Sequence, residues 1–184
     1  GMNPYVKRWA FRATRIYTRQ NGLAQWYSEK AAIGSDMNPS HIVRECLTDP
    51  DWGMGYPDSA IDEASFVAVA NTLHSEGLGI SLLWDKSKDL SDFIQDILSH
   101  IQGSLYVSRS TGKFVFKLTR ADYSVGSLVV LDENSITKIT EFKRSSVGEL
   151  INSVTVVYWD SDTGNDGSVT VQDIALISQQ QSVI

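Results

Sequence analysis

The side chains that could carry out chemistry gather in one stretch, between residues 37 and 66. His41 and Glu45 lie four residues apart on a predicted helix, a spacing at which two side chains can share a metal ion or a carboxylate can orient an imidazole. Only these two ligands are visible, and a hydrogen-bonded pair on the surface is the simpler interpretation. The sequence therefore predicts neither a metal site nor a cofactor here.

Cys46 is the only cysteine in the chain, and it is the one candidate for a thiol nucleophile. His41 would be its base, but five positions apart on a helix the two side chains lie on different faces. Cys46 also falls on the apolar side of that helix, where a thiol is buried and unreactive. We therefore expect no catalytic residue, with a wall-degrading or peptidase module as the alternative.

A second candidate for metal binding is the acidic loop from Asp160 to Gly167. Alternate acidic residues with glycine resemble a calcium-binding loop of the EF-hand type. Such a loop needs an oxygen donor in place of Gly164, a glycine in place of Asn165 and a glutamate in place of Val171. The sequence thus predicts a hairpin turn, and a calcium-stabilised adhesin is the alternative.

Three large side chains alternate with two glycines in the stretch from Trp52 to Tyr56. Glycine lets a backbone bend tightly, so we predict an ordered loop on which the rings and the thioether can pack. Trp52, Met54 and Tyr56 could anchor a contact with another subunit, because exposed aromatic and apolar side chains are typical of interfaces. The alternative is that these three side chains cover the core of their own domain.

Two predicted helices flank this loop. The dipeptides Asn38-Pro39 and Asp49-Pro50 predict the start and the end of the first helix, because asparagine caps an N-terminus and the residue before proline leaves the helical region. Its apolar face includes Cys46, and Arg44, Glu45 and His41 are expected to face away from that side. Asp62 predicts the N-cap of a second helix, which should run to Glu76 and stop at Gly77.

The remainder of the chain is predicted to contain one further helix among strands. Apolar residues at a 3.6-residue period predict a helix from Leu90 to Ile101, closed by Gly103. Strands are expected at residues 5–16, 23–27, 78–84, 104–109, 113–119, 128–131, 136–144, 152–160 and 168–172. The expected fold class is α+β, with antiparallel hairpins or a meander and about three α-helices packed on the sheet.

The domain organisation is expected to have three parts. Residues 1–34 form an N-terminal strand segment, residues 35–120 a helix-containing α+β domain, and residues 121–184 a C-terminal β segment that pairs with the N-terminal strands. The one positive cluster, which we interpret as a solvated strand face, consists of Lys7, Arg8, Arg12, Arg15 and Arg19. We expect the chain to be part of a longer protein.

Composition narrows the classes of partner. The 22 acidic and 16 basic residues give a net charge of −6, which argues against the basic surface that grips a nucleic-acid backbone. No apolar run approaches the roughly 20 residues that span a bilayer. We therefore expect neither a membrane partner nor sequence-specific contact with nucleic acid.

From about Ala31 to Gln172 the chain resembles one family of phage and prophage tail proteins. These are the tail-tip attachment, or host-specificity, proteins of lambda-like siphophages, and the likeness is to their central hub region. The motifs that carry it are Asn38-Pro39, Cys46-Leu47-Thr48, Trp52-Gly53-Met54-Gly55, Ile61-Asp62-Glu63-Ala64-Ser65-Phe66, Phe93 to Leu98, the hairpin around Gly112 and Val154-Thr155-Val156.

The resemblance implies a structural protein of the virion tail that is made in the cytoplasm of the bacterial host. Its copies would assemble as a ring, usually a trimer, together with other tail proteins at the baseplate hub. Receptor contact in that family belongs to later C-terminal modules, and the hub region has no catalytic residues. DNA passing through the tail would touch such a ring only passively.

Overall fold

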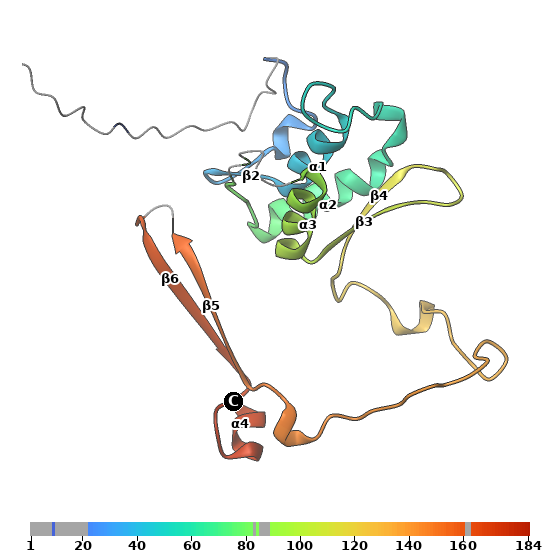
Figure 1. The fold of residues 1–184 in the computed structure, drawn as a ribbon, viewed down its shortest axis with the longest axis vertical. Coiled ribbons are helices and arrows are strands. Elements are labelled where there is room, and N and C mark those ends of the chain that lie inside the picture. Colours follow the sequence, from blue (N-terminus) through green and yellow to red (C-terminus); the bar gives the residue numbers. More distant parts are fainter. Residues whose placement is uncertain (1–8, 10–21, 83, 85–88, 161–162) are drawn as a thin grey trace, which may run out of the picture. The chain divides into compact units, whose positions relative to one another are not determined.

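The computed structural model describes residues 9, 22–82, 84, 89–160 and 163–184. The chain divides into two compact units between Ser124 and Val125. Its described residues form four α-helices and three antiparallel two-stranded hairpins, with helices contacting strands (Figure 1). The predicted α+β class is confirmed. The strand predicted at residues 5–16 lies outside the described residues except for Trp9.

The first helix, α1, spans Pro39–Thr48 and begins at the predicted cap. The Asn38 side-chain oxygen accepts a 3.0 Å hydrogen bond from the backbone N–H of Ser40. The Asn38 amide nitrogen donates to the carbonyl oxygens of Lys30 at 3.0 Å and Ala70 at 2.9 Å. One buried side chain therefore joins the start of α1 to two other parts of the chain.

The second helix, α2, spans Glu63–Glu76, as its caps predict. The Asp62 carboxylate accepts a 3.0 Å hydrogen bond from the backbone N–H of Ser65. Gly77 ends the helix with a φ of 72°, a left-handed conformation that glycine adopts without strain. The hydroxyl of Ser65 also accepts a 3.1 Å hydrogen bond from the N–H of Phe116, which ties the helix to a strand.

The third helix, α3, spans Leu90–Ile101, again as predicted. Its end differs from the prediction, because Gln102 takes the left-handed conformation, with a φ of 53°, and Gly103 begins the next strand. A Cβ atom at Gly103 would lie 2.9 Å from the ring of Phe116. Glycine is therefore required at position 103 by its close contact with Phe116, and not by the end of α3, which falls at Gln102.

The predicted hairpin around Gly112 is confirmed. β3 (Gly103–Val107) pairs antiparallel with β4 (Phe114–Leu118). A parallel bridge joins Phe114 of β4 to Ile61, just before α2. β4 therefore pairs with β3 along one edge, and on its other edge it contacts the residue just before α2.

A short hairpin precedes α1. β1 (Ala32–Ile33) pairs with β2 (Asp36–Met37), and an isolated bridge joins Met37 to Ile80. The strand predicted at residues 78–84 is wrong, because the described residues there form only this single bridge. Its two hydrogen bonds, 3.1 and 2.9 Å long, run in both directions between Met37 and Ile80.

Three other predicted strands are absent from the described residues. Residues 23–27 form no strand but a single bridge residue at Ala24, followed by a turn at Trp26 and Tyr27, where Tyr27 has a left-handed φ of 47°. At residues 128–131 and 136–144 the chain is irregular and mostly exposed. Short 3-10 helices lie in the segments that connect the other elements: η1 (Ser28–Lys30), η2 (Asp58–Ala60), η3 (Val125–Ser127) and η4 (Val147–Glu149).

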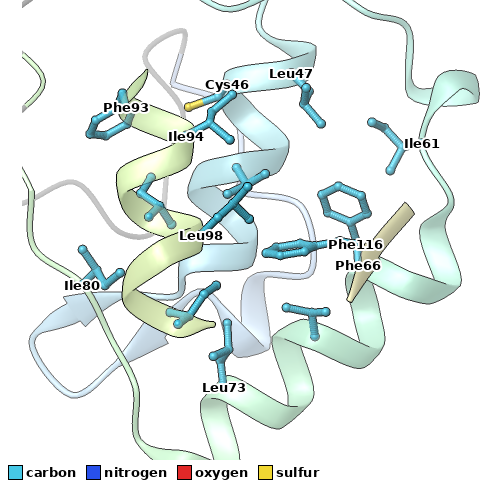
Figure 2. Packing of buried hydrophobic residues seen from close by; sticks show 14 of the residues in the cluster. Cys46, Leu47, Ile61, Phe66, Leu73, Ile80, Phe93, Ile94, Leu98 and Phe116 are labelled. Atoms are coloured by element: carbon cyan, nitrogen blue, oxygen red, sulfur yellow. The ribbon is translucent and has the colours of Figure 1, made fainter. Parts of the chain in front are cut away.

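The core of the first unit lies among α1, α2, α3 and β4 (Figure 2). Each large apolar side chain buried there contributes roughly 1.5–3 kcal/mol. The rings of Phe66 and Phe116 meet edge to face, with centroids 5.3 Å apart. The cluster consists of Ile33, Val43, Cys46, Leu47, Ile61, Phe66, Val69, Leu73, Ile80, Phe93, Ile94, Ile97, Leu98, Ile101 and Phe116.

The second unit contains the predicted C-terminal hairpin. β5 (Ser153–Asp160) pairs with β6 (Asn165–Gln172) along its whole length. A fourth helix, α4 (Ile174–Gln180), was not predicted. Asn152 joins the base of the hairpin to the C-terminus, since its side-chain oxygen accepts a 2.8 Å hydrogen bond from the N–H of Ile184. In the described residues, no helix has the length and apolar character to cross a membrane.

Candidate functional site

The loop between α1 and α2 is fastened to the end of α1. The backbone N–H of Met54 donates a 2.8 Å hydrogen bond to the carbonyl oxygen of Cys46. The N–H of Tyr56 donates a 2.9 Å hydrogen bond to the carbonyl of Leu47. The last carbonyls of a helix have no partner within it, so the loop supplies partners that water would otherwise provide.

A buried aspartate shapes the first half of this loop. The carboxylate of Asp49 accepts hydrogen bonds from the N–H groups of Asp51 at 2.9 Å and Trp52 at 3.1 Å. An aspartate that binds the backbone ahead of it forms an Asx-turn. The carbonyl oxygen of Asp49 accepts a further bond from the N–H of Gly55 at 3.1 Å. Both ends of the loop are thus held by one residue.

The two glycines of the loop meet two different requirements. A Cβ atom on Gly53 would lie 2.7 Å from the carbonyl oxygens of both Asp49 and Cys46, so no larger residue fits. Gly55 has a φ of 70°, which side chains with a Cβ rarely adopt. These constraints agree with the predicted ordered loop.

The three predicted interface residues do not share one environment. Trp52 packs against the core and against Trp84, with ring centroids 5.6 Å apart. Met54 and Tyr56 remain 43% and 42% exposed. The Tyr56 ring contacts the edge of Phe114, with centroids 4.8 Å apart. Trp52 therefore anchors the loop, and Met54 and Tyr56 present its outer surface.

The polar side chains of α1 are buried, which corrects the prediction that they face away from the packed side of the helix. His41 is 1%, Arg44 5% and Glu45 4% exposed. The segment just before η1 covers them: the ring of Trp26 lies 4.9 Å from the His41 ring and 4.9 Å from the Arg44 guanidinium carbon. Both sides of α1 are thus packed.

His41 is held as a neutral ring. Its Nε2 donates a 3.0 Å hydrogen bond to the carbonyl oxygen of Tyr27, and its buried Nδ1 has no hydrogen-bond partner among the described residues. Burial lowers the pKa of His41, although the nearby carbonyl oxygens of Tyr27 and Trp26 oppose the effect. A neutral imidazole in contact with rings on one side serves packing and has no access to a substrate.

Arg44 and Glu45 have partners other than His41. Arg44 donates a 2.9 Å hydrogen bond to the Asp58 carboxylate, and the Glu45 carboxylate accepts one of 3.1 Å from Gln25. Glu63 lies 3.8 Å from the Arg44 guanidinium. The predicted hydrogen-bonded pair of His41 and Glu45 on the surface is therefore wrong, because both side chains are buried and each bonds to a different neighbour.

Cys46 lies in the core, fully buried, in the same cluster as Phe66 and Leu73 (Figure 2). Burial raises the pKa of its thiol to about 12, so almost none of it is thiolate at neutral pH. The predicted buried thiol is confirmed. Cys46 as the nucleophile of a peptidase has no support in this geometry.

The acidic loop closes the β5–β6 hairpin, as predicted, with Asp160 opposite Asn165. Gly164 takes a left-handed φ of 66°, and its N–H donates a 2.8 Å hydrogen bond to the Asp160 carbonyl. Within the described residues, which exclude 161 and 162, no three His, Cys, Asp or Glu side chains are grouped to hold a metal ion.

No family model and no curated protein sequence matches this chain. What supports a function is therefore the arrangement of the loop, the packed helix behind it and the motifs of the sequence.

Two features of that arrangement gave little signal in the sequence. The buried polar side of α1 depends on Trp26 and Tyr27, which no motif connects with the helix, and the bonds from the loop to α1 depend on backbone geometry.

Proposed function

We propose that the protein is a structural component of a phage or prophage tail tip, part of a hub-like ring at the baseplate, and that it acts by assembly without catalysis. Its partners are other copies of the chain, with a trimer as the expected ring, and other tail proteins. Its location is the virion tail. The resemblance of the Asn38 to Phe66 motifs to tail-tip hub regions supports this function.

The observation that carries the proposal is the rigid loop from Trp52 to Tyr56. Interfaces gain affinity when exposed anchor side chains are already held in place, because less conformational freedom is lost on binding. Here Met54 and Tyr56 are exposed, while the backbone N–H groups of both bind α1. A methionine and an aromatic ring on a fixed loop are suited to a contact between subunits.

Charge is consistent with a ring around DNA. The chain carries 22 acidic and 16 basic residues, so its average field repels the phosphate backbone. DNA would therefore pass such a ring without being held. Membrane contact is not part of the proposal.

The test introduces substitutions of the exposed residue Met54 into the gene for this protein in the phage genome. Met54→Glu should prevent tail completion, because it places a charge at the proposed subunit contact. Met54→Leu should support normal tails, since it keeps an apolar side chain of similar volume. Leu82→Glu, at an apolar residue of the same unit that is 56% exposed, serves as the matched control and should also leave tails intact.

Plaque counts and electron micrographs of lysates provide the readout. Tail-less heads or tails without a tip in the Met54→Glu lysate alone would support the proposal. Normal titres and complete tails for Met54→Glu and for a Tyr56→Ala variant would contradict the assignment of the loop as a subunit contact.

A further inference from the structure

One edge of strand β3 is hydrogen-bonded to β4. At one end of the hairpin the N–H of Ser108 donates a 2.9 Å hydrogen bond to the carbonyl oxygen of Lys113. At the other end the N–H of Thr119 donates a 2.9 Å hydrogen bond to the carbonyl oxygen of Gln102. Bonded and non-bonded pairs alternate along an antiparallel ladder, so the even-numbered residues of β3 bond to β4.

The other edge of β3 has unpaired backbone groups. By the same alternation, the odd-numbered residues of β3 direct their N–H and C=O groups away from β4. In the part of the chain that the structure describes, these groups of Leu105 and Val107 have no hydrogen-bond partner. Val107 is also 51% exposed. Such an edge can accept the backbone of another strand.

The outer edge of β4, in contrast, is occupied by the start of α2. The carbonyl oxygen of Phe114 accepts a 2.9 Å hydrogen bond from the N–H of Asp62, and the N–H of Phe116 donates one of 3.1 Å to the hydroxyl of Ser65. A further strand can therefore join this hairpin only beside β3.

The hairpin is a positive region in a chain whose net charge is −6. From residue 97 to residue 121 there is no acidic residue, and the basic residues are Arg109, Lys113, Lys117 and Arg120. Arg120 forms a 2.7 Å ion pair with Glu76. The other three basic side chains are exposed and have no ion pair with a described residue. Charge therefore favours an acidic partner.

The two lysines share one face of the hairpin. Lys117 lies opposite Ser104, and Lys113 bonds through its backbone to Ser108, so a small side chain accompanies each lysine. A strand added beside β3 would lie about 10 Å from β4, because neighbouring strands are about 4.8 Å apart. A lysine that extends over serine can meet a glutamate across this distance.

The opposite face of the hairpin is apolar. Leu105 lies opposite Phe116 and Val107 lies opposite Phe114. The ring of Phe114 contacts Tyr56, so this face continues the exposed surface of the loop that we propose as a subunit contact. A strand beside β3 would place alternate side chains on this apolar face and the others on the lysine face.

We propose that the unpaired edge of β3 binds an extended segment of a neighbouring tail protein in which apolar and acidic residues alternate. The segment adds a third strand to the hairpin, a common way to recognise extended chains. This inference rests on the proposed function in assembly and gives the chemistry of one partner. A second copy of β3 fits less well, because antiparallel pairing would bring Lys113 and Lys117 of both copies to one face.

The first experiment titrates the full 184-residue chain into a labelled peptide of about ten residues in which valine and glutamate alternate. Fluorescence anisotropy should show saturable binding with a Kd below about 1 mM. A peptide in which valine and lysine alternate is the matched control, and it should bind at least about tenfold more weakly.

Two pairs of variants separate the backbone from the charges. Val107→Pro removes an outward N–H and should weaken binding by about tenfold or more, whereas Val107→Thr keeps that N–H and should alter binding by less than about threefold. Lys113→Glu/Lys117→Glu should reverse the preference between the two peptides. Lys138→Glu/Lys143→Glu, the same change of charge at exposed lysines of the second unit, should not reverse it.

Amide hydrogen exchange tests the edge without any substitution, and so decides if Val107→Pro does not fold by circular dichroism. Exchange of the Leu105 and Val107 N–H groups should slow by about fivefold or more when the valine–glutamate peptide saturates the chain. Unchanged exchange, equal binding of the two peptides or equal effects of the two lysine pairs would overturn the inference.

Self-association of the chain without peptide, abolished by Val107→Pro, would assign the edge to a second copy and also overturn the stated partner. These outcomes leave the tail-tip proposal standing if the protein is found in purified particles. Absence from particles together with selective peptide binding would reject the tail-tip proposal and keep the binding edge.

Discussion

The backbone N–H of Tyr56 donates a 2.9 Å hydrogen bond to the carbonyl oxygen of Leu47. Leu47 is 1% exposed in the core, and Tyr56 is 42% exposed on the surface. A single bond therefore connects a side chain available to a partner with the packed end of α1. Because the loop backbone is already fixed, a partner that binds this surface loses little free energy in ordering it.

Gly53→Ala tests whether the loop depends on close contact with α1. The added Cβ would lie 2.7 Å from two carbonyl oxygens, so we expect a loss of about 1–3 kcal/mol in the free energy of unfolding, measured by urea titration. Gly126→Ala is the control, because it has open space around it, and it should change stability by less than about 0.5 kcal/mol. Equal stability of the two variants would show that the loop is free to move away.

Asn38→Ala tests the buried cap of α1. The change removes the bond to Ser40 and leaves the carbonyl oxygens of Lys30 and Ala70 without their donor. We expect a loss of about 2–4 kcal/mol, since a cap alone contributes about 1 kcal/mol and the loss of two further buried hydrogen bonds adds to it.

The control for the cap is Asp89→Ala at the N-cap of α3. Asp89 makes no side-chain capping bond, so its replacement should cost less than about 0.5 kcal/mol in the same titration. If the Asn38 variant were as stable as the Asp89 variant, the bonds of Asn38 to Lys30 and Ala70 would contribute nothing.

His41 should make the fold sensitive to acid. Its pKa is lowered in the folded state, so below its ordinary value of 6.5 the unfolded chain binds a proton that the folded chain does not. Stability is therefore complete above pH 6.5 and falls as the pH drops towards the folded pKa, by at most about 1.4 kcal/mol per pH unit.

The comparison that isolates this effect is His41→Gln, whose amide can still donate to the Tyr27 carbonyl. Urea titrations at pH 7.5 and 5.5 should show a smaller loss of stability for His41→Gln than for the unmodified chain. If His41→Gln lost as much stability between pH 7.5 and pH 5.5 as the unmodified chain, other groups would be the cause of the acid sensitivity.

Cys46 should react with thiol reagents only when the fold opens. A thiol with a pKa of about 12 is thiolate to roughly one part in ten thousand at pH 8, and burial blocks access as well. Labelling by a disulfide reagent should thus follow global unfolding and accelerate with urea. Labelling of the native chain within seconds would show an accessible thiol and reopen the peptidase alternative.

Local signals were sufficient to predict the helices of the first unit. Asn38, Asp62 and the periodic apolar residues from Leu90 act within a few positions of the elements they define, so no tertiary contact is needed to recognise them. The β3–β4 and β5–β6 hairpins were predicted for the same reason, because turn residues such as Gly112 lie between two apolar stretches.

Features that depend on distant residues were not predicted. Alternating patterns at residues 78–84, 128–131 and 136–144 satisfy strand preferences, but a strand also requires a partner, and the described residues provide only Met37 for Ile80. The burial of His41 depends on Trp26 and Tyr27, which cover α1 because Tyr27 adopts a left-handed backbone conformation. No sequence pattern predicts this turn.

The most direct test of the proposed tail-tip function is quantitative mass spectrometry of gradient-purified phage particles. The expected result is that the full-length protein is present at a few copies per particle, about three for a trimeric ring. Deletion of its gene should leave particles without a complete tail. Absence of the protein from particles, with complete tails in the deletion strain, would contradict the proposal.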